Sequence, residues 1–158
     1  MAEKTVSGVT VDELFRYVGL LPHEPVRWKT EISEYCAGIY VIALAQKADN
    51  CQFCKESVAI AKLDEDKLKA ESNHWIPEEV ILYIGQTTKQ TLAHRLHQFY
   101  VHKYGDRSPH RGGQAIHLLN CDCWVYWAPT PDAKLAEKKM LEYFRERACR
   151  FPFANRLG

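Results

Sequence analysis

The chain has 158 residues, about the length of one folded domain, and 46% of them are apolar, which excludes a largely disordered protein. Its 21 lysines and arginines balance 20 acidic residues, so it does not bind partners through overall charge. The longest apolar run, residues 37–45, is far shorter than the roughly 20 residues of a membrane span. No apolar segment follows the first residues, so we expect no secretory signal and no membrane contact. We therefore expect a cytoplasmic protein whose cysteines are reduced.

The first part of the chain predicts one short helix and two buried strands. Apolar residues spaced for one helical face predict an amphipathic helix over residues 11–20, and residues 22–34 follow as an extended lead-in. Residues 38–45 and 79–85 are short, continuous apolar runs rich in β-branched side chains, a pattern typical of buried strands.

The segment between these two strands, residues 46–78, differs in composition. It contains Cys51, Cys54 and an acidic stretch, and residues 63–70 are compatible with one or two helical turns. Because about thirty residues are too few for an independent core, we interpret the segment as an insertion in a long hairpin and not as a second domain.

The second part of the chain predicts two further helices. Residues 92–104 and 133–149 have helical apolar spacing, residues 106–113 form a loop with a proline and two glycines, and residues 115–119 and 121–128 favour one or two strands. The whole order predicts a small α/β (α+β) domain in which helices pack on an antiparallel sheet.

Charge is distributed unevenly along the chain. Residues 86–118 hold five basic residues against one acid, together with five of the seven histidines, and residues 132–158 carry an excess of three positive charges. This mildly basic half suits contacts with phosphates better than a membrane surface, and solvated surface charge is the simpler alternative.

Five residues resemble a known signature when they are taken in order. The tripeptide Gly-Ile-Tyr ends at Tyr40, and Tyr-Ile-Gly begins at Tyr83. An arginine, Arg95, follows on the next predicted helix; Glu137 precedes two apolar residues three and four places on; and a Pro-Phe-Ala-Asn segment ends at Asn155. Together they resemble the GIY-YIG nuclease family.

The resemblance spans residues 37–156 and implies a fold and an activity. The fold would be a small central antiparallel sheet flanked by helices. Residues 1–36 would form an N-terminal helix and extended lead-in to a single GIY-YIG-like domain over residues 37–158, with residues 46–78 inserted between the first two core strands. The implied activity is that of a divalent-metal-dependent endonuclease that hydrolyses phosphodiester bonds in DNA and cuts one strand per active site.

The resemblance also implies a role for each of the five residues. Glu137 would be the protein carboxylate on Mg²⁺ or Mn²⁺, an ion that needs only one or two carboxylates. Arg95 would clamp the scissile phosphate with its fork of donors. Tyr40 would act as general base or orient the water, and Tyr83 would share its hydrogen bonds. Asn155 would brace the site.

The sequence departs from the family pattern in three ways. The two tyrosines are separated by 42 residues, where a short link is usual. Phe99 stands four residues after the arginine, where many members have a histidine or tyrosine, and Glu142 is an alternative to Glu137 as metal ligand. Three side chains could replace the missing polar group in space: His97, Tyr100 and His110.

Basic and imidazole side chains are the candidates for substrate contact. They are Lys89, His97, His110 and Arg111. Gly112 and Gly113 would let backbone amides approach phosphates closely. Because this chain has no room for a separate DNA-binding domain, specificity would come from loops, the insertion, a homodimer or a partner protein.

The cysteines provide an alternative reading. Two pairs could together form a structural zinc site with four thiolates: Cys51 with Cys54, and Cys121 with Cys123. Free thiols are the simpler alternative, and Cys36 and Cys149 are expected to be small core residues. Two other functions stay open: an inactive nucleic-acid- or protein-binding module on the same scaffold, which the phenylalanine at 99 suggests, and a small zinc-binding regulatory domain.

Overall fold

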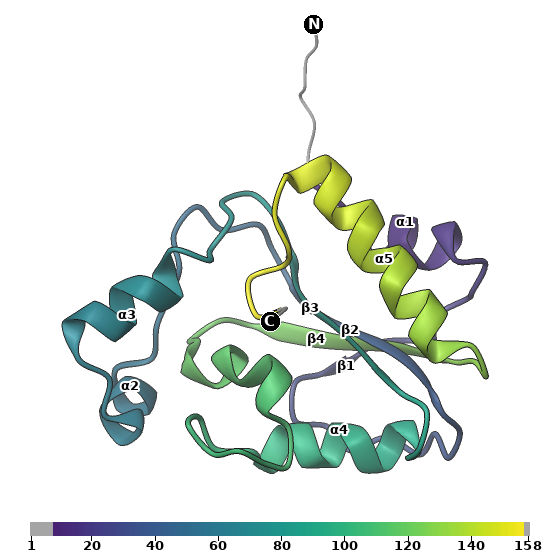
Figure 1. The fold of residues 1–158 in the computed structure, drawn as a ribbon, viewed down its shortest axis with the longest axis horizontal. Helices are drawn as coiled ribbons and strands as arrows, with labels where there is room; N and C mark the ends of the chain where they lie inside the picture. Colours follow the sequence, from purple (N-terminus) through teal and green to yellow (C-terminus); the bar gives the residue numbers. More distant parts are fainter. Residues whose placement is uncertain (1–7, 157–158) are drawn as a thin grey trace, which may run out of the picture.

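The computed structural model describes residues 8–156 and is built around a four-stranded antiparallel sheet with the strand order β1-β4-β2-β3 (Figure 1). The strands are β1 (Val26–Arg27), β2 (Gly38–Leu44), β3 (Ile81–Thr87) and β4 (Cys123–Pro129). All seven residues of β2 are buried because this strand lies at the centre of the sheet, between β3 and β4. The prediction of a mixed fold with an antiparallel sheet and helices is confirmed.

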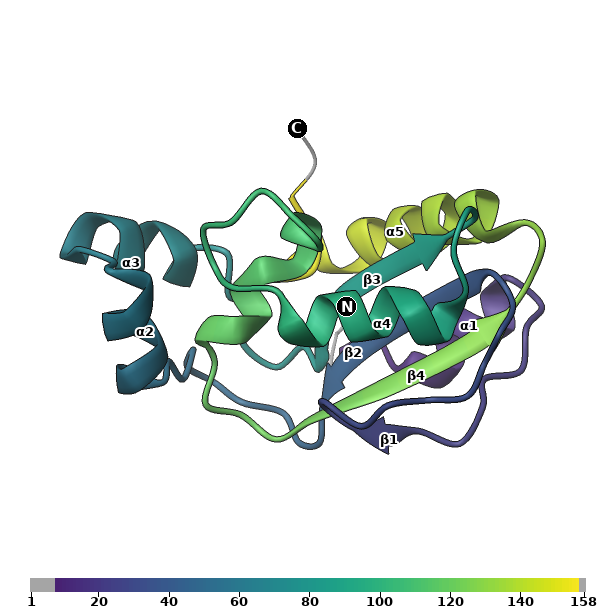
Figure 2. The ribbon, with the colours of Figure 1, turned by 90° about the horizontal axis from the view of Figure 1, so that it is seen from below.

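Helices cover both faces of the sheet. Helices α1 (Val11–Tyr17) and α5 (Ala133–Ala148) pack on one face, and α4 (Leu92–Val101) and the 3-10 helix η1 (Arg111–Leu118) cover the other (Figure 2). Alternate residues of β2 divide between the two cores, as the strand pleat requires: Ile39 lies on the α5 side and Tyr40 on the α4 side.

The segment between β2 and β3 carries two short helices, α2 (Lys55–Ala61) and α3 (Glu65–Ser72), neither of which has a buried residue. They project beyond the end of the sheet (Figures 1 and 2). The segment is attached at both ends, because Phe53 forms an isolated bridge with Leu119 and the buried Trp75 packs edge-on against Phe153.

The lead-in expected to be extended contains the two-residue strand β1, in which Val26 pairs with Val125 of β4. Two other expectations of local structure were wrong. Residues 115–119 form most of the 3-10 turn η1 instead of a strand, because a short apolar run fits either period. Cys36 and Cys149 are exposed and do not belong to the core.

No helix within residues 8–156 is long and apolar enough to cross a bilayer. The first seven residues of the N-terminal segment lie outside the described residues.

Candidate active site

The two signature tyrosines lie on the same face of adjacent strands. Tyr40 is opposite Gly85, and Tyr83 is opposite Ile42, so the two rings are diagonal neighbours with centroids 6.1 Å apart. Both side chains are buried, with 1% of Tyr40 and 8% of Tyr83 exposed. The tyrosines therefore form one aromatic unit below α4 and η1.

Gly85 is needed for this arrangement. A Cβ atom at this position would lie 2.6 Å from Cζ of Tyr40 and 2.6 Å from Cε2 of Tyr83, distances that real Cβ contacts do not show. The Tyr40 ring therefore packs directly against the backbone of β3 at Gly85, where a side chain would not fit. The glycine of the second tripeptide has a packing reason that its sequence position alone did not reveal.

A histidine in the loop before η1 contacts the Tyr40 hydroxyl. The Tyr40 hydroxyl lies 2.6 Å from Nε2 of His110, whose side chain is fully buried. The His110 ring stacks on Phe99, with centroids 3.9 Å apart and planes 6° from parallel. Phe99 is therefore a platform for the His110 ring, and the polar atom in contact with the Tyr40 hydroxyl belongs to His110.

The other two candidates for this role lie elsewhere. His97 is exposed and its Nδ1 is 3.0 Å from a carboxylate oxygen of Glu31. Tyr100 is buried on the same helix, but its ring packs edge-on against Trp28 and its hydroxyl has no partner among the described residues. Of the three alternatives, the structure brings only His110 into contact with Tyr40.

Burial sets the protonation of this group. Burial and, as the second cause, the nearby Arg95 charge together lower the pKa of His110 to about 3. Burial raises the pKa of Tyr83 to about 12 and that of Tyr40 well above its ordinary value, while Arg95 lowers both. At neutral pH the imidazole is therefore neutral and both phenols keep their protons.

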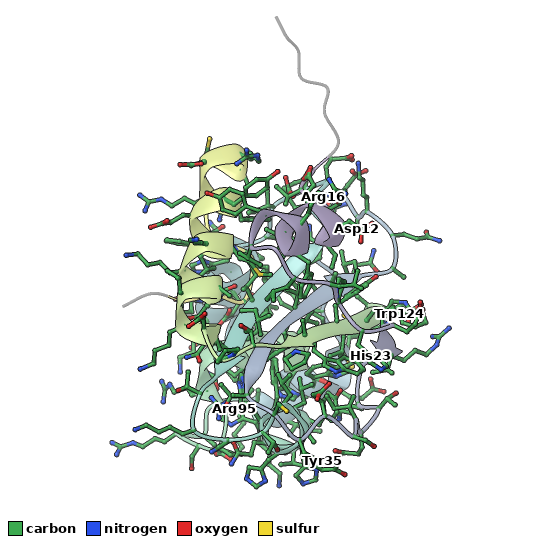
Figure 3. All side chains as sticks on the ribbon, turned by 90° about the vertical axis from the view of Figure 1, so that its right-hand side faces the viewer. Asp12, Arg16, His23, Tyr35, Arg95 and Trp124 are labelled. Carbon is green, nitrogen blue, oxygen red and sulfur yellow. The ribbon has the colours of Figure 1, made fainter. Side chains whose placement is uncertain are left out.

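Arg95 is held beside the two tyrosines by α4 and the loop before η1. Helix α4 begins after Thr91, whose hydroxyl caps it by accepting from the His94 amide at 3.0 Å. One guanidinium nitrogen of Arg95 donates to the Pro109 carbonyl at 2.8 Å and to Gln98 Oε1 at 3.0 Å. The Pro109 carbonyl could not be found from the sequence, because it is a backbone group in a loop, whereas Gln98 lies three residues further along the same helix. Figure 3 places Arg95 on the opposite side of the sheet from α1.

Glu137 is on α5, and only the effect of its charge on the two tyrosines links it to them. It is half-buried, burial raises its pKa, and its charge raises the pKa values of Tyr40 and Tyr83. Its carboxylate has no hydrogen-bond or ion-pair partner within residues 8–156. Glu142, one turn further along, is exposed. The site thus lies across the edge strand β3, between helices on the two faces of the sheet.

These residues fit a divalent cation in the manner that the sequence suggests. A half-buried carboxylate without a partner is costly unless a cation or donor meets it. Mg²⁺ keeps most of its waters and binds through one or two carboxylates, which Glu137 alone can supply. The described residues contain no group of three or more His, Cys, Asp or Glu side chains placed to hold a metal.

Asn155 holds the edge strand instead of facing a substrate. Its Oδ1 accepts from the Ile84 amide at 3.0 Å, and its Nδ2 donates to the Ile84 carbonyl at 2.9 Å. Both bonds are buried, and Ile84 is the residue directly after Tyr83. Asn155 therefore acts on the position of Tyr83 through the backbone.

The predicted substrate contacts are scattered. Lys89 is exposed in the turn between β3 and α4, and Arg111 is exposed at the start of η1. Gly112 is exposed, but Gly113 is buried, and a Cβ there would be 2.7 Å from Cζ of Phe99. The second glycine serves packing against Phe99, so the expectation that both glycines admit a phosphate was wrong for Gly113.

Three of the four candidate zinc ligands belong to the core on the α4 side of the sheet or pack against it: Cys123 is buried there, and Cys51 and Cys121 pack against it. Burial raises the pKa of Cys51 to about 12, with the nearby Cys121 as the second cause, and burial raises that of Cys123 to about 12. Cys54 precedes α2 and its thiol lies 3.4 Å from a carboxylate oxygen of Glu56. The four-thiolate zinc site stays a prediction.

Comparison of the chain with models of protein families, with curated proteins and with solved structures found no significant match.

Proposed function

We propose that this chain is a divalent-metal-dependent endonuclease of the GIY-YIG type, which hydrolyses phosphodiester bonds in DNA one strand at a time. The observation that supports this most strongly is the meeting of four predicted residues from four different elements. Tyr40, Tyr83, Arg95 and Glu137 come from β2, β3, α4 and α5, and the charges of Arg95 and Glu137 act on the pKa values of both tyrosines. They are separated by as many as 97 positions in the chain (137 − 40).

Tyr40 and His110 would prepare the attacking water. With its proton on Nδ1, the neutral imidazole accepts a hydrogen bond from the Tyr40 hydroxyl through Nε2. This fixes the hydroxyl and turns the oxygen's lone pairs toward the site, where they can accept a hydrogen bond from a water. His110 is a positioning residue in this scheme, because it acts through Tyr40.

Arg95 and Glu137 would handle charge at the phosphate. Arg95 has donors fixed in one plane, and these can bind the non-bridging oxygens of the scissile phosphate. Glu137 would hold Mg²⁺ or Mn²⁺, which when bound supplies charge neutralisation at the phosphate and assistance to the leaving oxygen. Because one site cuts one strand, a double-strand break would need a homodimer or two successive visits.

The alternative is an inactive binding module. The reason to consider it is Phe99, which has no polar atom at a position where many members of the GIY-YIG family have a histidine or tyrosine. His110, stacked on Phe99 and in contact with Tyr40, supplies a polar atom at that place. We therefore favour the enzyme.

Cleavage of supercoiled plasmid tests the proposal. Wild type should nick the plasmid with Mg²⁺ or Mn²⁺ and not with EDTA, and Glu137→Gln should lower the rate at least about a hundredfold. Glu142→Gln is the matched control, since this exposed glutamate lies on the same helix, and its rate should equal that of wild type. Loss of cleavage in Glu142→Gln with retention in Glu137→Gln would refute the metal role of Glu137. Absence of metal-dependent cleavage of plasmid, branched DNA and RNA would favour the binding module.

A further inference from the structure

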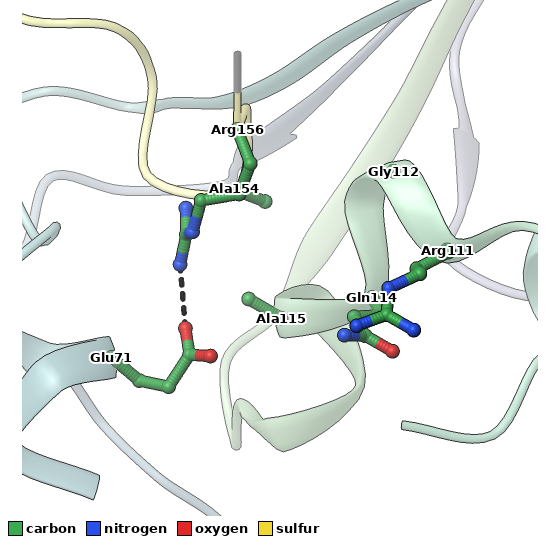
Figure 4. A pocket seen from close by; sticks show the side chains of 7 residues that line it. All are labelled: Glu71, Arg111, Gly112, Gln114, Ala115, Ala154 and Arg156. Carbon is green, nitrogen blue, oxygen red and sulfur yellow. Dashed lines mark hydrogen bonds and ion pairs between the residues drawn. The ribbon is translucent and has the colours of Figure 1, made fainter. Parts of the chain in front are cut away.

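A cavity of about 400 Å³ lies beside the candidate active site, between the inserted segment and the C-terminal segment (Figure 4). Its volume is within the range of small-molecule sites, roughly 300–1,000 Å³. The residues that line it come from α3, η1 and the C-terminal segment: Glu71, Arg111, Gly112, Gln114, Ala154 and Arg156. No role of the active site accounts for it.

The cavity shares walls with the structure that positions Tyr83. A Cβ atom on Gly112 would lie 3.2 Å from the Tyr83 hydroxyl. Gly112 also lines the cavity, so this one residue of η1 stands between the cavity and Tyr83. On the C-terminal side, the Ala154 amide donates to the Leu82 carbonyl at 2.8 Å. A group in the cavity would therefore be next to a substrate held at Tyr83.

The charged side chains leave the cavity with one net positive charge. Both oxygens of Glu71 are engaged: Oε1 lies 2.5 Å from Arg156, and Oε2 accepts from the Tyr104 hydroxyl at 2.5 Å. Arg111 has no ion-pair partner within residues 8–156. Arg111 could therefore form an ion pair with an anion that enters the cavity.

Gln114 adds an oriented donor. Its Oε1 accepts from the Gly105 amide at 2.8 Å and lies 3.2 Å from Nε2 of His102. Because the amide oxygen is engaged on this side, Nε2 is the group left to donate to a ligand. The methyl groups of Ala115 and Ala154 supply small apolar wall area beside it.

We propose that this cavity binds a nucleotide that flanks the scissile phosphate, with its phosphate at Arg111 and Arg156 and its sugar or base against the alanines and Gln114. The proposal rests on the proposed nuclease function for the identity of the substrate. A free phosphate ion would leave most of the volume empty, and a nucleotide fills it better. The inserted segment would then contribute to substrate binding through Glu71, which tempers the charge of Arg156.

Equilibrium binding without divalent metal tests the cavity separately from cleavage. The probe is thymidine 5′-monophosphate, titrated by calorimetry and followed by NMR at the Gly112 amide and the Gln114 side-chain amide. Arg111→Ala should weaken binding about tenfold, because it removes a charged donor. Glu71→Gln should tighten binding several-fold, because the cavity gains positive charge while glutamine can still accept from Tyr104.

The matched control is Arg16→Ala, which removes an exposed arginine on α1, on the other side of the sheet (Figure 3). It should bind the nucleotide as wild type does. Equal affinity of wild type, Arg111→Ala and Glu71→Gln would overturn the proposal, as would no binding at millimolar nucleotide. Binding with this pattern in a protein that cuts no nucleic acid would uphold the cavity and refute the nuclease function. Cleavage that depends on Glu137 without such binding would do the reverse.

Discussion

The Tyr40 hydroxyl and His110 form a buried pair at the centre of the candidate site. A buried polar group costs free energy unless it has a partner. Here the Tyr40 hydroxyl and Nε2 of His110 are partners, while Nδ1 of His110 is buried with no hydrogen-bond partner among the described residues. The stacking on Phe99 restricts the imidazole to one plane, so the hydrogen bond has a fixed direction. A change at His110 should therefore act on how Tyr40 is oriented.

Substitution of His110 tests this role at the residue scale. His110→Phe keeps the stack on Phe99 and removes the acceptor, and it should lower kcat about a hundredfold with a smaller change in KM. His110→Gln retains an acceptor and should recover part of that rate. His23→Gln, at an exposed histidine before β1 to which no role is assigned, is the control and should match wild type.

The pH dependence of the cleavage rate distinguishes a positioning role of His110 from a purely structural one, because a purely structural role would leave that dependence unchanged. Because burial lowers the pKa of His110 to about 3, the wild-type rate should show no inflection from this histidine between pH 5 and 8. A wild-type inflection near pH 6.5 that disappears in His110→Phe would contradict the neutral imidazole. Equal rates for His110→Phe and wild type would remove His110 from the mechanism.

At the scale of elements, the edge strand β3 depends on the C-terminal segment. An edge strand presents backbone groups with no partner strand, and β3 has Tyr83 on it. Asn155 satisfies the outward amide and carbonyl of Ile84 with one side chain. This explains why an asparagine so far along the chain belongs to the pattern of site residues.

Replacement of Asn155 should therefore affect stability before chemistry. Asn155→Ala leaves both backbone groups of Ile84 without their partner and should lower the free energy of unfolding by about 2–3 kcal/mol. Urea unfolding followed by circular dichroism measures it. Asn120→Ala is the control, since Asn120 is exposed, and it should change stability by less than about 0.5 kcal/mol. Equal stability of both variants would show that Ile84 does not need Asn155.

The elements also show how far sequence patterns reach. The strands 38–44 and 81–87 and the helices 92–101 and 133–148 follow from periodic apolar runs, and their ends differ from the predictions by a few residues. The two-residue strand β1 and the turn η1 do not follow, because their form is set by tertiary partners on β4 and on Phe99.

The same limit applies to the site. Tyr40, Tyr83, Arg95 and Glu137 follow from the resemblance to a family signature, and the sequence alone cannot show that the charges of Arg95 and Glu137 lie near enough to act on both tyrosines. The choice of His110 over His97 and Tyr100 required the path of the loop before η1. The cavity at Glu71 required the fold of the inserted segment, for which the sequence gives composition and little periodicity.

At the scale of the whole molecule, buried histidines couple folding to pH. Burial lowers the pKa of His110 to about 3 and that of His117 to about 4, below the value of 6.5 expected in the unfolded chain. Between these values the unfolded state binds more protons, so the free energy of unfolding rises with pH. This contribution is complete above about pH 6.5 and is lost as the pH falls toward 4. Glu137 and Glu79, whose pKa values are raised by burial, act in the opposite direction but with smaller shifts.

The protein should therefore be less stable at pH 5 than at pH 7, with about 2 kcal/mol of the difference from His110 alone. Urea unfolding at the two pH values measures the difference, and His110→Phe should reduce it by about that amount because phenylalanine binds no proton. His94→Asn, which removes an exposed histidine, should keep the wild-type difference. If His110→Phe unfolds with the same pH dependence as wild type, then His110 is protonated in the folded protein at pH 5, and its hydrogen bond to Tyr40 must have the imidazole as donor.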